Sequence, residues 1–411
     1  MPIPCSVTYL DGCDDLSTWT QSIGTGCTVT ENTDPAYLIS PKAKSFRFTL
    51  AIDGAASNRI DLTKNIAYQW IPDDRIGLFM YVPNKPASHD QSLFVYGSDQ
   101  VAFGSGGVGR WQRSYGSSSG IGTENQGWQI VPIQFGDTSV TSGAPTRNLS
   151  YLSMRLQCTA SASYAKEFYI AGIVRWDARP TVIVQFDDGM VSQYTEAFSY
   201  MQPLGIPGTV FLIDDLIELE TTVSPGFLKA SQVREMVNAG WTAGTHGAVT
   251  NSWEYSPSTQ IKLDTEKLRQ RFGYPFEHGA YPNGAYGQLS GVYQPTQDAL
   301  RVAGIKSCRT VNTHVLHPAC YSPYTLPATL NLQSGLTPAQ AIAGIDRTIK
   351  LRTTCIIIAH KIDPSADGSS QYSRANFRQV IDHVAMRRRQ GLLDALSWHD
   401  WWNGTRARAA A

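Results

Sequence analysis

The sequence predicts two folds in one chain: an all-β N-terminal sandwich of jelly-roll type and a C-terminal α/β domain built as a distorted (β/α) barrel. Up to about residue 178, short runs of alternating apolar and polar residues are separated by turn residues, which is typical of half-buried strands. From residue 179 to 402, apolar strand-like runs alternate with helix-like stretches, which predicts a parallel sheet. We therefore place the domains at residues 1–177 and 178–405.

The first domain is predicted to be all-β because apolar and polar residues alternate with a period of two. The clearest example has apolar side chains at every second position: Phe46, Phe48, Leu50 and Ile52. Residues 152–158 repeat the pattern, and turn residues such as Asp53-Gly54 punctuate the runs. The Gly- and Ser-rich segment 104–127 is expected to be a loop, and its Trp111 and Tyr115 are either a platform for sugar rings or ordinary packing residues. This domain is predicted to bind carbohydrate or to serve attachment.

The composition excludes several classes of protein. Thirty-four basic and thirty-four acidic residues cancel, so no global field favours nucleic acid. No apolar run approaches the roughly 20 residues of a membrane span, and the N-terminus lacks the pattern of a secretory signal. The seven cysteines show no metal-binding spacing, although Cys5 with Cys13, or Cys308 with Cys320, are possible pairs.

The most informative feature of the second domain is a pair of carboxylates. Asp187 and Asp188 directly follow the apolar run 181–186, which reads as a buried strand. Neighbouring strand residues point to opposite faces, and a buried charge costs several kcal/mol unless it is paired or bound to a metal. The pattern suits a hydrolase that uses one carboxylate on a metal and the other to take a proton from water. An Asx-type turn that merely closes the strand is the alternative.

Four motifs of the second domain occur in a recognisable order and spacing: Phe186-Asp187-Asp188-Gly189, Gly244-Thr245-His246, Ala280-Tyr281-Pro282-Asn283-Gly284 and Ile358-Ala359-His360. They resemble the polysaccharide deacetylase family, the NodB-homology group or carbohydrate esterase family four, and the resemblance runs from about residue 178 to 405. It implies a distorted (β/α) barrel and metal-dependent hydrolysis of N- or O-acetyl groups on an acetylated surface polysaccharide.

The resemblance also implies a role for each matching residue. Asp188 and His246 would bind one divalent metal, with zinc the first choice, and Asp187 would be the catalytic base. His360 would be the catalytic acid. The backbone N–H of Asn283 would hold the oxyanion, and the neighbouring loop residues would bind substrate: Tyr281 and Pro282.

The sequence departs from the family pattern at two places. Thr250 stands where the family has a second histidine, so we expect Asn251 or Thr250 as a weaker metal ligand. Ala280 replaces an arginine that orients the base in many members, and Asp363 is the candidate to orient His360 instead. Three other histidines have no match in the family: His278 is expected to be a loop residue, and His314 or His317 is a spare candidate for the missing metal ligand.

Two other functions stay open: a catalytically weak glycan-binding protein on a deacetylase-like barrel, and an amidohydrolase that acts on a non-glycan substrate. A surface glycan and the absence of a signal peptide are reconciled if the protein belongs to a phage tail spike or fibre. It would then act outside the cell as a homo-oligomer, a trimer in the case of a tail spike. The alternatives are a signal missing from the given sequence and a non-standard export system.

Overall fold

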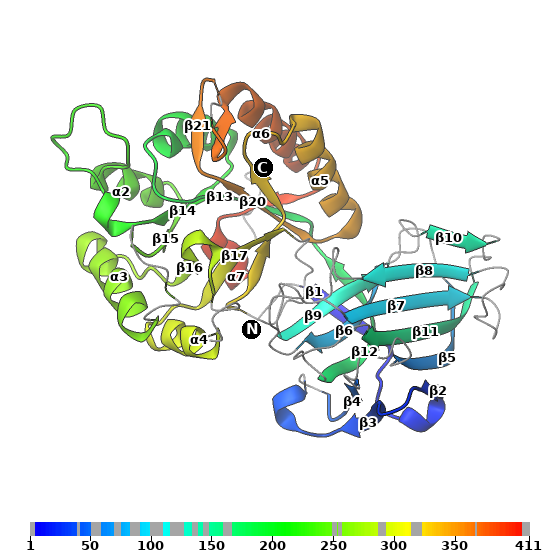
Figure 1. Ribbon diagram of the computed structural model, residues 1–411. Coiled ribbons are helices and arrows are strands. Elements are labelled where there is room, and N and C mark those ends of the chain that lie inside the picture. Colours follow the sequence, from blue (N-terminus) through cyan, green and yellow to red (C-terminus); the bar gives the residue numbers. More distant parts are fainter. Residues whose placement is uncertain are drawn as a thin grey trace. The chain divides into compact units, whose positions relative to one another are not determined.

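The computed structural model describes residues 5–38, 42–50, 59–69, 75–82, 91–98, 110–115, 127–133, 139–142, 148–158, 167–248, 253, 257–286, 293–313, 323–365 and 368–404. Over these residues the chain forms two compact units, Cys5–Asp177 and the part that starts at Ala178 (Figure 1). Among the described helices, none is long and apolar enough to cross a membrane.

The first unit consists of two six-stranded sheets, and neighbouring strands along their two main orders run antiparallel. One has the order β3-β4-β12-β6-β9, with β1 paired to β12, and the other has the order β10-β8-β7-β11-β5-β2. The strands are β1 (Cys5–Asp11), β2 (Thr20–Ile23), β3 (Thr28–Asn32), β4 (Ser45–Thr49), β5 (Arg59–Gln69), β6 (Ile76–Val82), β7 (Gln91–Ser98), β8 (Arg110–Tyr115), β9 (Gly127–Ile133), β10 (Ser139–Ser142), β11 (Asn148–Cys158) and β12 (Glu167–Ala178). Two short 3-10 turns accompany them, η1 (Leu16–Thr18) and η2 (Pro35–Tyr37).

The two sheets bury one common core. Phe48 of β4 lies in the same apolar cluster as Leu62 of β5 and Met154 of β11, which belong to the other sheet. In β4 the apolar side chains are buried and Arg47 between them is exposed, as the period-two pattern predicts. The prediction of an all-β first part is therefore confirmed, whereas a jelly-roll order stays a prediction.

The expected loop 104–127 contains a strand, β8, so that part of the prediction is wrong. The side chains of Trp111 and Tyr115 lie outside the described residues. Trp128, just after this segment, is 8% exposed and packs edge-on against Phe79 with ring centroids 5.5 Å apart. Its ring is packed on the sheet, which excludes it as an exposed sugar platform.

The second unit is a nearly closed barrel of parallel strands. Its sheet has the order β18-β17-β16-β15-β14-β13-β20-β19, with β23 paired to β13. The strands at the two ends of this order, β18 and β19, are separated along the chain by Thr329 alone, so the sheet curves until its ends meet. The strands are β13 (Thr181–Phe186), β14 (Gly208–Leu212), β15 (Thr242–Thr245), β16 (His278–Ala280), β17 (Ser307–Thr313), β18 (Leu326–Ala328), β19 (Leu330–Leu332), β20 (Thr354–Ala359) and β23 (Asp394–Ala395). The predicted distorted (β/α) barrel is confirmed.

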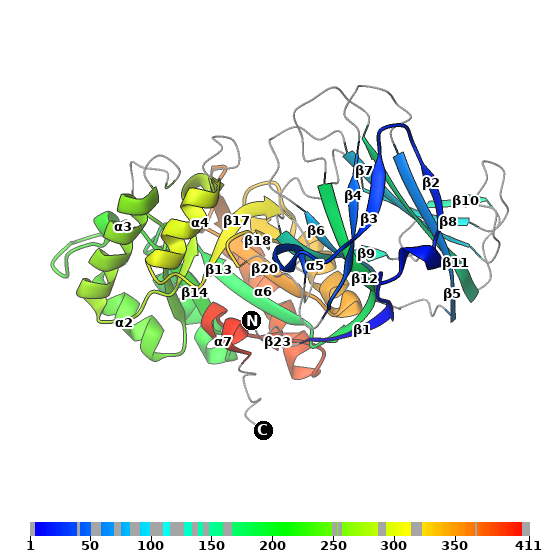
Figure 2. The ribbon, with the colours of Figure 1, turned by 90° about the horizontal axis from the view of Figure 1, so that it is seen from below.

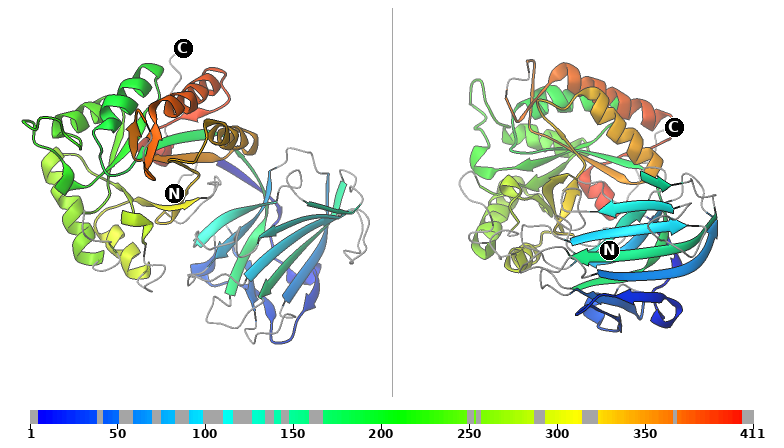
Figure 3. Two further views of the ribbon diagram at one scale, coloured as in Figure 1. Left: turned by 45° about the horizontal axis from the view of Figure 1, so that its top comes forward. Right: turned by 45° about the vertical axis from the view of Figure 1, so that its right-hand side comes forward.

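Helices surround the strands on the outside (Figure 3). All residues of β13 and β20 are buried, because helices cover one face of the sheet and barrel side chains fill the other. The helical segments are η4 (Gln193–Phe198), α1 (Ser199–Met201), η5 (Gln202–Leu204), η6 (Asp214–Leu216), α2 (Ala230–Asn238), α3 (Pro257–Phe272), η7 (Pro282–Gly284), α4 (Tyr293–Val302), α5 (Pro338–Leu351), α6 (Arg374–Arg389) and α7 (Trp398–Asn403). A small two-stranded ladder, β21 (Lys361–Asp363) with β22 (Gln371–Ser373), follows β20.

Helix α7 closes the barrel at the N-terminal ends of its strands (Figure 2). The Trp398 backbone N–H donates to Thr209 Oγ1 at 3.0 Å, and its indole Nε1 donates to Ser307 Oγ at 2.8 Å. Trp401 Nε1 donates to Thr354 Oγ1 at 3.2 Å. These partners are among the first residues of β14, β17 and β20. The tryptophans near the C-terminus therefore close the barrel, and its opposite end, where the strands finish, carries the acidic pair.

Candidate active site

The carboxylate pair emerges where β13 ends, and its two members have different surroundings. Asp187 is 1% exposed and donates its backbone N–H to Ala359 O of β20 at 3.0 Å. Asp188 has a φ of 71°, the left-handed region that a non-glycine residue seldom adopts, and its side chain is 28% exposed. The turn thus buries one carboxylate and presents the other to solvent.

Arg309 of β17 is the functional residue that the sequence analysis missed. Its Nη2 donates to Asp187 Oδ1 at 2.5 Å and to Oδ2 at 2.6 Å, and its side chain is fully buried. Burial raises the pKa of Asp187, but the Arg309 charge and its hydrogen bonds to the carboxylate oppose burial, and that pKa lies below its usual value. A buried arginine from another strand therefore contacts both oxygens of the carboxylate that follows β13. The available signal was an arginine at the end of the segment 303–309, which resembles a later strand of the family.

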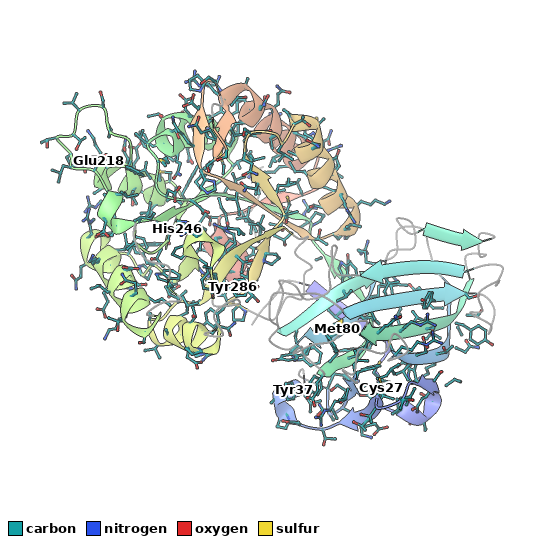
Figure 4. All side chains as sticks on the ribbon, viewed as in Figure 1. Cys27, Tyr37, Met80, Glu218, His246 and Tyr286 are labelled. Carbon is teal, nitrogen blue, oxygen red and sulfur yellow. The ribbon has the colours of Figure 1, made fainter. Side chains whose placement is uncertain are left out.

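His246, labelled in Figure 4, follows β15 and is held by two backbone contacts. Its backbone N–H donates to Leu212 O at 2.8 Å, and its Nδ1 lies 2.9 Å from Ala280 O. A carbonyl can only accept, so Nδ1 carries the proton and the lone pair of the neutral ring is on Nε2. Nε2 lies 3.6 Å from Asp188 Oδ1 and 4.0 Å from Asp187 Oδ2.

His360 reaches the same carboxylate from the end of β20. Its Nε2 lies 3.9 Å from Asp187 Oδ2. Gln193 of η4 is buried and donates through Nε2 to Asp187 O at 2.5 Å and to His360 O at 3.2 Å, so one amide fixes both backbones. The structure therefore brings together His246, His360 and Asp187, which the sequence spreads over more than 170 residues.

Asp363 does not orient His360, contrary to the expectation from the sequence. Its carboxylate pairs with Lys361 Nζ at 2.6 Å and accepts from Ser365 N at 3.1 Å. These contacts, that with Lys361 first, lower the pKa of Asp363 to about 2. Nδ1 of His360 is buried without a hydrogen-bond partner among the residues that the structure describes.

The loop after β16 places its residues at different depths. Asn283 is exposed with a φ of 54°, whereas Pro282 and Tyr281 are buried. The Tyr281 hydroxyl donates to Tyr324 O at 2.8 Å, so its ring supports the loop from behind. Gly247 has a φ of +76°, and a Cβ there would lie 2.6 Å from Pro282 Cγ, so the close approach of loop and strand end requires glycine.

The described part of the site fits a divalent metal. The His246 Nε2 lone pair faces Asp188, and their 3.6 Å separation is near the roughly 3.3 Å between two ligands on one tetrahedral zinc. The Ala280 carbonyl on Nδ1 is the outer contact that metal-binding histidines usually have. The expected third ligand, Asn251 or Thr250, and the spare candidates His314 and His317 lie outside the described residues.

Part of the second unit matches a known family of proteins. Residues 176–297 match the family model of polysaccharide deacetylases. The matched residues include the carboxylate pair, His246 and the loop around Asn283, whereas Arg309 and His360 lie beyond them. The match supports the resemblance found in the sequence for the second unit. No curated protein matches the chain.

The chain is also similar to solved structures of deacetylases. A deacetylase from Streptococcus pyogenes in complex with acetate is 18% identical, with a TM-score of 0.32 over 48% of this chain and 69% of that chain. A polysaccharide deacetylase from Bacillus cereus is 16% identical, with a TM-score of 0.36 over 54% of this chain and 93% of that chain. A family 4 acetyl xylan esterase from Clostridium thermocellum, in complex with a cobalt ion, is 14% identical, with a TM-score of 0.36 over 54% of this chain and 90% of that chain. All three similarities are distant.

Proposed function

We propose that the second unit hydrolyses acetyl groups, N- or O-linked, from an acetylated surface polysaccharide. The observation that carries the proposal is the convergence of four side chains from the ends of three strands: the buried Asp187, the partly exposed Asp188 and the two imidazoles. His246 Nε2 and His360 Nε2 approach the same Asp187 oxygen at 4.0 and 3.9 Å. The family match over residues 176–297 supports the same reaction.

In this proposal Asp188 and His246 hold one divalent metal, zinc or a similar ion, with Asn251 or Thr250 as the third ligand. When bound, such an ion supplies Lewis-acid polarisation of the acetyl carbonyl and lowers the pKa of a water molecule. Asp187 takes the proton of the attacking water as general base. Arg309 keeps Asp187 ionised and fixes its orientation, because it contacts both oxygens.

His360 then protonates the leaving amine or alkoxide. In the strand order, β13 with Asp187 lies between β20, which carries His360, and β15, which His246 follows. The acid and the metal ligand therefore approach the carbonyl from different sides. The Asn283 backbone N–H would stabilise the negative oxygen of the tetrahedral intermediate. Pro282 and Tyr281 shape the loop that carries Asn283, and Tyr281 acts through packing because its side chain is buried.

Acetate release tests the proposal directly. Acetylated chitooligosaccharides and an acetylated bacterial capsule should release acetate with an intact backbone, and treatment with a chelator should abolish the release until zinc is restored. Binding of glycan without acetate release would instead support a catalytically weak glycan-binding protein. Turnover of small amides without turnover of glycans would support an amidohydrolase.

For the first unit we propose carbohydrate binding or attachment, since the described residues of its two sheets bring no cluster of acid, base and metal-ligand side chains together.

An enzyme that acts on the cell surface as part of a phage tail spike or fibre would be a homo-oligomer. Light scattering of the purified chain tests the trimer, and a truncated protein that starts at residue 178 tests the division of labour. The truncated protein should still release acetate from small substrates but bind polymer more weakly.

A further inference from the structure

A second group of metal-ligand side chains lies at the N-terminal ends of the barrel strands, away from the carboxylate pair. It consists of Glu277 and His278, at the start of β16, and His399 of α7. One ligand atom from each residue lies within 4.8 Å of the other two. His278 is the first residue of β16 and buried, so its expected assignment to a loop is wrong. Ala280, at the other end of this short strand, contacts His246, so the two groups lie at opposite ends of β16.

His278 is a buried side chain with one unused nitrogen. It is 1% exposed, and its Nδ1 lies 2.9 Å from Ser307 Oγ, which also accepts from Trp398 Nε1 at 2.8 Å. Its Nε2 is buried and has no hydrogen-bond partner among the described residues. A buried polar atom without a partner costs about 1–3 kcal/mol, so such atoms usually have a ligand, a water or an ion beside them.

We propose that Glu277, His278 and His399 bind a divalent transition-metal ion of the zinc class, at a site separate from that of Asp188 and His246. Two imidazoles and one carboxylate are a ligand set that zinc and cobalt accept, with a water completing four-coordination. Ligand atoms on a tetrahedral zinc are about 3.3 Å apart, so contraction from at most 4.8 Å requires movements of only about 1 Å per side chain.

The surroundings of the three residues suit this role. Ser307 Oγ beside His278 Nδ1 is the outer contact that fixes a ligating ring. Asn403 Nδ2 lies 2.9 Å from His399 Nε2, so metal binding by His399 requires the Asn403 amide to turn and present its oxygen to this ring. Glu277 and His399 are partly exposed, so an ion can enter from solvent. Because His399 belongs to α7 and His278 to β16, a bound ion would tie the closing helix to the barrel.

Lys306 is a neighbour that opposes a cation. Its Nζ lies 2.7 Å from Glu277 Oε2, but it is 47% exposed and occupies one carboxylate oxygen only. The ammonium lowers the affinity for a dication by repulsion. Lys306→Gln should therefore tighten zinc binding by about 3- to 10-fold. If Lys306 and Glu277 form only a structural ion pair and no metal site is present, Lys306→Gln should not tighten zinc binding.

Zinc titration of chelator-treated protein, followed by calorimetry, tests the proposal. The wild type should bind two ions. His399→Gln should bind one and still release acetate, and His246→Gln should bind one and release none. The double variant should bind none. If the active site itself fails to hold zinc, the wild type binds one ion, and that ion is lost in His399→Gln but kept in His246→Gln. The two proposals are thus tested independently.

Thermal melting in the His246→Gln background gives a second readout. Zinc at a hundredfold excess over its Kd should raise the melting temperature of the barrel by about 5–10 °C, and adding His399→Gln should remove the rise. The surface substitution Glu277→Gln, which is compatible with folding, should weaken the same response. Equal zinc stoichiometry in wild type and His399→Gln, with an unchanged melting response in Glu277→Gln, would overturn the proposal.

Discussion

Replacement of Arg309 tests the most strongly coupled contact of the site. The side chains of Arg309 and Asp187 are 0% and 2% exposed, and one guanidinium nitrogen donates to both carboxylate oxygens. Removal of one partner from a buried ion pair leaves the other charge uncompensated, which typically costs about 3–5 kcal/mol. We therefore expect Arg309→Met to lower the free energy of unfolding of the barrel at pH 7 by about 3 kcal/mol or more.

The same substitution should change the pH dependence of acetate release. The pKa of Asp187 lies below its usual value, so its ionised form stabilises the fold above the unfolded pKa of about 3.9, and this stabilisation is lost as the pH falls through the folded pKa. Loss of the Arg309 charge raises the pKa of Asp187. The acid limb of kcat/KM should then move to higher pH by about one unit or more, since one unit corresponds to about 1.4 kcal/mol.

Two variants serve as controls for this prediction. Arg309→Lys keeps the charge but loses the two-oxygen contact, so its stability and acid limb should be intermediate. Arg301→Met removes a surface pair with Asp298, at 2.6 Å and 59% and 52% exposure, and should change stability by less than about 1 kcal/mol.

A double-mutant cycle with Asp187→Asn isolates the pair itself. We expect a coupling energy of about 2 kcal/mol or more between the two positions, measured by denaturant unfolding. A coupling energy near zero, together with an unchanged acid limb in Arg309→Met, would refute the conclusion that Arg309 keeps Asp187 ionised.

Three further predictions concern the same strand ends. Asp187→Asn should reduce acetate release by about 10²–10⁴-fold with the circular dichroism spectrum unchanged, and near-normal turnover would exclude Asp187 as the base. His360→Ala should lose a similar factor on N-acetyl substrates but much less on an aryl acetate, whose leaving group needs no proton; equal losses on both would contradict its role as the acid. Gly247→Ala should destabilise the barrel by about 1–3 kcal/mol in denaturant unfolding, because the new Cβ meets Pro282 at 2.6 Å in a left-handed conformation, whereas Gly226→Ala, with open space around its Cα, should have little effect.

The sequence alone determined the elements and half of the site. Period-two alternation around Phe46 and the apolar run before Asp187 are local patterns, set by which faces of a strand meet water, so they can be read without knowing any partner. The carboxylate pair could be singled out because it follows a strand-like run, whereas His246 and His360 were singled out by the motifs that resemble the deacetylase family. The carboxyl ends of parallel strands meet at one edge of a sheet, which is why these residues lie together in the structure.

Only the tertiary structure decided which charges face each other. Arg309 and Asp187 are 122 residues apart, and their contact depends on a barrel that brings β17 toward the end of β13. Asp363 is close to His360 in sequence, yet it pairs with Lys361, because the turn into β21 directs it elsewhere. His278, read as a loop residue, lies buried beneath α7 and near His399. Periodicity reports burial along one element, whereas such pairings follow from strand order and barrel closure, and these are properties of the whole chain.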